Sequence, residues 1–126
     1  MKRVLRALPG RFAVARLAPE ATWPSWAQDS QGLLCLTRTA DETSVVCDEV
    51  LVPDGVRCER GFVAFVVNGP IDFAVTGLLA ELAAPLALDG ISLFAISTFD
   101  TDYLLVRAHD AARAIASWRA SGSVID

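Results

Sequence analysis

The second half of the chain alternates short apolar segments with longer segments of helical period, and this order restricts the fold more than any other feature. Segments of strand length and composition occupy residues 61–67, 91–97, 103–106 and 123–125. Residues 72–88 and 110–120 instead repeat apolar side chains three and four positions apart, as on one face of a helix. The order β-α-β-β-α-β predicts a ferredoxin-like α+β unit, in which two helices cover one face of an antiparallel sheet.

Two residues are expected to shape the first predicted helix. Asp72 stands at its expected start and can cap it, because a carboxylate accepts hydrogen bonds from the N–H groups of a first helical turn. Pro85 lacks an N–H group and is expected to kink the helix or to split off its final turn.

The first half of the chain contains predicted strands without predicted helices. The strands span residues 11–17, 33–38 and 44–50, and the last two form a hairpin. Between the first two lies a loop that contains Trp23 and Trp26 and has no helical period. We interpret this loop as a seal over the apolar core, and the alternative is a lid over a binding site.

A weak internal repeat relates the two halves at an offset of 60 residues. Thr43-Ser44-Val45-Val46 aligns with Tyr103-Leu104-Leu105-Val106, and Glu42 falls opposite Asp102 at the end of a five-residue polar turn. The repeat predicts a degenerate first subdomain over residues 1–58 and a complete one over 59–126. The alternative is two unrelated hairpins.

Composition excludes several classes of protein. The 126 residues carry 15 acidic and 11 basic side chains, which argues against a nucleic-acid-binding surface. No apolar run approaches the roughly 18 residues of a membrane-spanning helix. One histidine and three cysteines without a C-x-x-C motif predict no metal site. Because Pro9-Gly10-Arg11 interrupts any apolar leader, we expect an unprocessed, cytoplasmic protein whose thiols are reduced.

The segment from Gly69 to Val106 resembles the ACT domain of the CASTOR type, the domain of the arginine sensors in animal nutrient signalling. The match is densest at Gly77, at Pro85-Leu86-Ala87, at Gly90-Ile91 and in the run Ile96-Ser97-Thr98-Phe99 that precedes Asp102. The first half fits as the degenerate partner domain that such chains carry. The resemblance implies two ACT-like units, a homodimer, and an amino acid bound at an inter-domain or inter-subunit interface without any cofactor.

Transferred position by position, the resemblance implies these ligand-binding residues: Asp72, Val75, Thr76, Gly77, Thr98, Phe99 and Asp102. A helix N-terminus offers free N–H groups to a carboxylate, and Asp102 can pair with an ammonium group. Each assignment has a structural alternative. Gly77 can serve close packing, Thr98 can satisfy its own turn, and Asp102 can be a solvated turn residue beside Arg107.

Val75 departs from the family pattern. The arginine-sensing members carry an acidic residue at this position, two residues before the glycine that matches Gly77. Loss of one carboxylate from a buried, charge-assisted pair costs about 1.5–3 kcal/mol. We therefore expect that arginine is not preferred, and that Phe73, Val75 and Phe99 suit a neutral or aliphatic amino acid.

An enzyme and a pure interaction module are the alternatives to a sensor. Catalysis lacks support because His109 stands at a helix start and no phosphate-binding motif is present, although Asp100 and Asp102 could share a proton. We expect no enzymatic activity and assign no catalytic residue. An interaction module would dimerise or dock on another protein without a small-molecule ligand. A sensor without an effector domain would also pass its signal to a partner protein.

Overall fold

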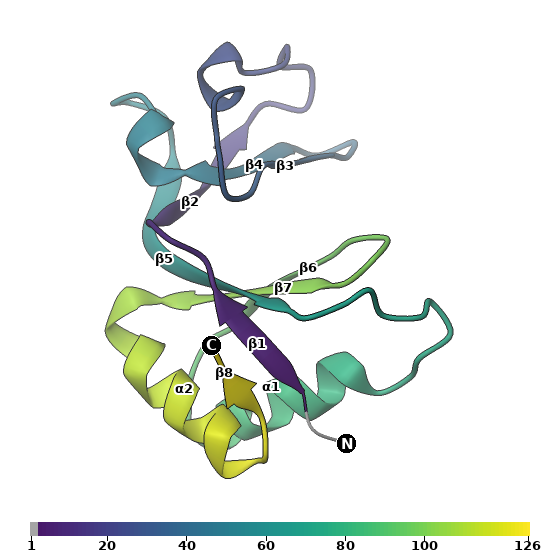
Figure 1. Cartoon of the computed structure of the whole chain (residues 1–126). Helices are drawn as coiled ribbons and strands as arrows, with labels where there is room; N and C mark the ends of the chain where they lie inside the picture. The colour runs from purple at the N-terminus through teal and green to yellow at the C-terminus, as the bar shows by residue number, and fades with distance from the viewer. Residues whose placement is uncertain (1–2) are drawn as a thin grey trace. The chain divides into compact units, whose positions relative to one another are not determined.

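The computed structural model describes residues 3–126, which form two compact units (Figure 1). The N-terminal unit is Pro9–Phe62, and the C-terminal unit combines Val63–Asp126 with the described residues up to Leu8. The sequence-based division assigned residues 1–58 to the first unit. The difference arises from β1 (Val4–Ala7), a strand that the sequence analysis missed, because it pairs with the C-terminal half of β5 (Cys58–Val67).

The C-terminal unit has the strand order β6-β7-β5-β1-β8. Its further strands are β6 (Phe94–Ser97), β7 (Asp102–Arg107) and β8 (Val124–Ile125), and its helices are α1 (Leu78–Leu88) and α2 (Ala111–Ala120). A 3-10 turn, η3 (Ala108–Asp110), precedes α2. Both helices cover the same face of the sheet (Figure 1). The predicted β-α-β-β-α-β order and the ferredoxin-like α+β class are confirmed.

The core of the C-terminal unit lies between the sheet and the two helices. Trp118 of α2 is fully buried, and its ring meets Phe65 of β5 edge-on with centroids 5.1 Å apart. The indole N–H donates to the carbonyl oxygen of Leu82 in α1 at 2.9 Å. Trp118 therefore joins both helices to the sheet through one apolar ring and one satisfied polar group.

Helix α1 begins six residues later than the sequence pattern predicts. Asp72 does not cap it, because one of its carboxylate oxygens accepts a hydrogen bond from the N–H of Ala74 at 2.8 Å and so closes a local turn. The residue before the helix is Gly77, whose φ of 80° suits glycine. Pro85 does not split off the last turn, since α1 continues to Leu88. Pro85 has no N–H group to donate to the carbonyl oxygen of Glu81, four residues earlier. Glu81 is an exposed residue that water can reach.

The N-terminal unit repeats the ferredoxin-like strand order with its helices reduced to 3-10 turns. The order is β3-β4-β2-β5, with β2 (Phe12–Leu17), β3 (Cys35–Arg38) and β4 (Thr43–Asp48). The turns η1 (Ser25–Ala27) and η2 (Glu49–Leu51) stand where α1 and α2 stand in the C-terminal unit. The expected hairpin of residues 33–50 is confirmed as β3–β4. Trp26 packs against the core, as a seal requires, whereas Trp23 is 48% exposed.

The β3–β4 and β6–β7 hairpins of the two units repeat at an offset of 59 residues, not 60. Arg38 pairs with Thr43 in the N-terminal unit as Ser97 pairs with Asp102 in the C-terminal unit. The turns between these strands also match, because the N–H of Thr39 donates to Glu42 O at 2.9 Å and that of Thr98 to Thr101 O at 2.8 Å. Each turn has four residues, so the expected alignment of Glu42 with Asp102 was wrong by one position.

Candidate functional site

The loop after β5 and the turn between β6 and β7 enclose a cleft of about 190 Å³, which we call the Asp102 cleft. Its lining residues are Ile71, Asp72, Phe73, Val75, Leu78, Ser97, Thr98, Phe99, Thr101 and Asp102. Five of the seven ligand-binding residues expected from the sequence lie in this lining. Thr76 and Gly77, which directly precede α1, are not among the lining residues.

Asp102 is the buried charge of this cleft. It is the first residue of β7, it is 9% exposed, and one of its carboxylate oxygens accepts a hydrogen bond from Ser97 Oγ at 2.5 Å. No lysine, arginine or histidine side chain is found among the described lining residues. A carboxylate held in this way favours a cationic group as its partner. The alternative of a solvated turn residue is therefore wrong.

The turn from Thr98 to Thr101 is fixed to the loop after β5. The N–H of Ile71 donates to Asp100 O at 2.6 Å, and the hydroxyl of Thr101 donates to Val67 O at 2.6 Å. A Cβ atom added to Gly69 would lie 3.1 Å from Asp100 O, so a glycine permits this close approach. The hydroxyl of Thr98 donates to Thr101 O and accepts from the N–H of Thr101. Thr98 therefore shapes the wall of the cleft by satisfying its own turn.

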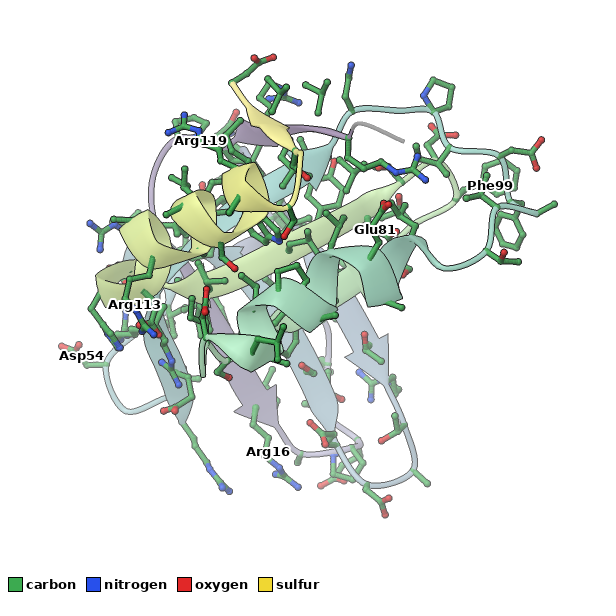
Figure 2. The ribbon with its side chains drawn as sticks, turned by 90° about the horizontal axis from the view of Figure 1, so that it is seen from below. Arg16, Asp54, Glu81, Phe99, Arg113 and Arg119 are labelled. Atoms are coloured by element: carbon green, nitrogen blue, oxygen red, sulfur yellow. The ribbon has the colours of Figure 1, made fainter. Side chains whose placement is uncertain are left out.

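Two exposed aromatic rings form the rim of the cleft. Phe73 is 80% exposed and Phe99 is 82% exposed, and their centroids lie 5.6 Å apart. Figure 2 shows Phe99 at the outer end of the loops, away from both helices. Val75 is 42% exposed beside them. Exposed aromatic rings that contact each other are typical of surfaces that bind an apolar group.

A further feature of the cleft is the start of α1. Leu78, the first residue of the helix, belongs to the lining. The first N–H groups of an α-helix have no partner within the helix and carry partial positive charge. The cleft thus lies between the carboxylate of Asp102 and the first residue of α1.

A second cleft of about 380 Å³ shares Thr101 with the first. Its lining residues are Arg6, Val66, Val67, Asn68, Gly69, Pro70, Asp100 and Thr101. The sequence analysis missed it because Arg6 belongs to β1, a strand without a strong apolar pattern. Only the pairing of β1 with β5 brings this arginine beside the loop.

Two further reactive groups, His109 and Cys47, lie outside the Asp102 cleft. The exposed ring of His109 has its Nε2 atom 3.5 Å from Asp110 Oδ2. Asp110 also forms an ion pair with Arg113, which Figure 2 labels, with 3.0 Å between Oδ1 and Nη1. Burial raises the pKa of the Cys47 thiol to about 11, so this cysteine is a poor nucleophile. In residues 3–126 no group of three or more potential ligands could hold a metal ion, and no helix could cross a membrane.

Two family models match the sequence of this chain. Residues 57–117 match the family model of the ACT domain. The chain contains an ACT domain. Residues 10–55 match a second family model, which describes an N-terminal domain. The two matches divide this ACT domain protein near the point at which β5 passes from one unit to the other. No curated protein matches it in sequence.

Solved structures share the fold over most of this ACT domain protein. An Agobacterium tumefaciens protein is 36% identical, with a TM-score of 0.94 over 100% of this chain and 93% of that one. A Vibrio cholerae protein of unknown function, described as a possible transport protein, is 16% identical, with a TM-score of 0.77 over 96% and 91%. The aspartate kinase of Clostridium acetobutylicum, described as an allosteric enzyme, is 10% identical, with a TM-score of 0.63 over 90% of this chain and 33% of that one.

Proposed function

We propose that this ACT domain protein is a non-catalytic regulatory module that binds a free amino acid in the Asp102 cleft. The observation that carries the proposal is the 9% exposed carboxylate of Asp102 in a cleft whose described lining has no basic side chain. Such a carboxylate gains most from a cationic partner, which the ammonium group of an amino acid supplies. The likeness in fold to part of an allosteric aspartate kinase supports a regulatory role.

The cleft suits each part of an amino acid. The ammonium group pairs with Asp102, and the carboxylate meets the N–H groups at the start of α1, near Leu78. The side chain then lies against Val75 and the rings of Phe73 and Phe99. This apolar rim favours a neutral, aliphatic side chain over that of arginine. Asp72 also lines the cleft, but the N–H of Ala74 already uses one of its oxygens.

We further propose that a second copy of the chain covers the occupied cleft. Phe73 and Phe99 would remain largely in water in a monomer, and burial of their rings at a homodimer interface would add hydrophobic stabilisation. The ligand then contributes to the dimer interface, and the signal passes to a partner protein that recognises the ligand-bound dimer.

A thermal-shift panel of the twenty amino acids tests the binding proposal. A ligand at 100 times its dissociation constant adds about 2.7 kcal/mol of stability, which for a domain of this size raises Tm by roughly ten degrees. We expect a selective shift from aliphatic amino acids. Asp102→Asn, which removes the charge and keeps the shape, should weaken binding by about 10- to 100-fold, the equivalent of about 1.4–2.8 kcal/mol.

Asp100→Asn is the matched control for this experiment. Asp100 lies in the same turn but outside the lining of the Asp102 cleft, so its replacement should leave the shift unchanged. Arginine that binds more tightly than leucine would contradict the proposed specificity. Unchanged binding by Asp102→Asn would contradict the proposed site.

A protein-interaction module without a small-molecule ligand is the second candidate. The exposed pair of Phe73 and Phe99 favours it, because a protein partner could cover both rings. A panel without any shift, together with a dimer that Phe99→Ser dissociates in sedimentation experiments, would support this function. A selective shift that Asp102→Asn abolishes would exclude it.

A further inference from the structure

The N-terminal unit contains a hairpin turn and a neighbouring loop that correspond to those around the Asp102 cleft. At the offset of 59 residues, Arg38 and Thr43 correspond to Ser97 and Asp102, and the turn that begins at Thr39 corresponds to the one that begins at Thr98. The loop after β2 takes the place of the loop after β5, because each follows the strand next to the matching hairpin. Both units therefore combine a hairpin turn with a neighbouring loop in this region, and we call this combination the frame.

In the N-terminal unit the side chain of Arg38 spans this frame. Its Nη1 donates to the carbonyl oxygen of Pro19, and its Nη2 donates to that of Ala21. The hydroxyl of Thr43 also donates to Pro19 O, at 3.4 Å. The loop after β2 is thus tied to the end of the β3–β4 hairpin through one guanidinium group. Ser97, the counterpart of Arg38, is too short to reach a loop and donates to Asp102 instead.

We infer that the N-terminal unit contains a guanidinium-binding site that its own Arg38 occupies. The acceptors are the backbone oxygens of Pro19 and Ala21. A guanidinium group is planar and directs N–H groups from two nitrogens in a fixed fork, so it satisfies two carbonyl oxygens together, whereas an ammonium group is a point-like donor. This site goes beyond the proposed amino-acid site, and its evidence is independent of it. The corresponding regions of the two units thus differ: one has the open Asp102 cleft, and in the other the guanidinium of Arg38 lies between the hairpin and the loop.

Removal of the internal ligand tests the inference. Arg38→Ala should lower Tm by several degrees, because the loop loses its connection to the hairpin. Methylguanidinium at millimolar concentration should then raise the Tm of Arg38→Ala by more than it raises that of the wild-type chain. Methylammonium at the same concentration should give no such difference, because it lacks the planar pair of donors.

Arg11→Ala is the matched control variant. Arg11 is an exposed arginine of the same unit whose side chain has no recorded hydrogen bond within the described residues. Its removal should change neither Tm nor the response to methylguanidinium. An unchanged Tm in Arg38→Ala, or an equal response to methylguanidinium in both variants, would overturn the inference.

A second measurement keeps the inference testable if Arg38→Ala does not fold. Nitrogen-15 NMR of the wild-type chain should show slow rotation of the Arg38 guanidinium about its Cζ–Nη bonds, since carbonyl oxygens hold both ends. Rapid rotation, equal to that of Arg11, would overturn the inference. The amino-acid panel on Arg38→Ala separates the two proposals, because binding in the Asp102 cleft should persist there whatever the guanidinium result.

Discussion

The two units of the chain share a hairpin turn and, apart from the extra strand β1 between β5 and β8, the order of their strands, but they bury their sheets in different ways. In the C-terminal unit, residues 68–93 and 108–123 connect the strands and contain α1 and α2, which supply leucines and Trp118 to the core. In the N-terminal unit the matching connections, residues 18–34 and 49–57, are shorter and form only 3-10 turns. Small residues such as Ala13, Ala15 and Ala27 fill much of that core. The comparison teaches that the strands preserve the topology while the connections decide how much apolar surface is buried.

The units also differ at one pair of facing positions. Thr43 is fully buried and neutral, whereas its counterpart Asp102 is buried and acidic. Beside them, the side chain of Arg38 donates to the loop after β2, whereas that of Ser97 donates to Asp102. The residues at these two pairs of equivalent positions therefore distinguish the units. In the N-terminal unit Arg38 occupies the region, whereas the C-terminal unit has an open, negatively charged cleft.

The largest expected effect is on the helical core. Trp118→Ala removes the largest fully buried side chain of the C-terminal unit and, with it, the indole donor to Leu82 O. We expect a loss of about 3–5 kcal/mol in the free energy of unfolding, measured by urea denaturation. Trp26→Ala should cost clearly less, because this ring only borders the smaller core. Equal losses from the two variants would contradict the difference between the cores.

The next largest effect is expected from a substitution that gives the C-terminal unit the arginine of the N-terminal unit. Ser97→Arg places the counterpart of Arg38 beside the open cleft, where the guanidinium can reach the loop after β5 and pair with Asp102. We expect the selective amino-acid shift in Tm to disappear while the chain remains folded. Ser97→Ala, which only removes the hydroxyl, should retain most of the shift. Full binding by Ser97→Arg would contradict the proposed location of the ligand.

The sequence predicted the architecture better than the ends of its elements. Apolar periodicity was sufficient for the β5-α1-β6-β7-α2-β8 order, because burial on one face requires it. The start of α1 was wrong because Val75 continues the helical spacing, while the local turn of Asp72 and the left-handed Gly77 interrupt the helix. β1 was missed because its four residues have no strong pattern and form a strand only through pairing with β5 and β8.

The candidate site was also predicted in part. Asp102 and Phe99 were expected from the resemblance to the ACT domain of the CASTOR type, and both lie in the lining of the Asp102 cleft. Thr76 and Gly77 were expected from the same resemblance, but they are not among the lining residues of the cleft. The contact of Arg38 with Pro19 and Ala21 could not be predicted, because it depends on a loop that folds back over the end of a hairpin.

The smallest expected effect concerns the pH dependence of stability. Burial raises the pKa of Cys47 from 9.0 to about 11, whereas its counterpart at the offset of 59 is the equally buried Val106. Between these pH values the folded chain keeps the thiol proton and the unfolded chain releases it, so stability falls as pH rises. Cys47→Val should flatten the fall of unfolding free energy between pH 9 and pH 11, measured by urea denaturation. Cys35→Ala should keep the wild-type slope because Cys47 is unchanged. An identical slope in Cys47→Val would show that this thiol does not couple folding to pH.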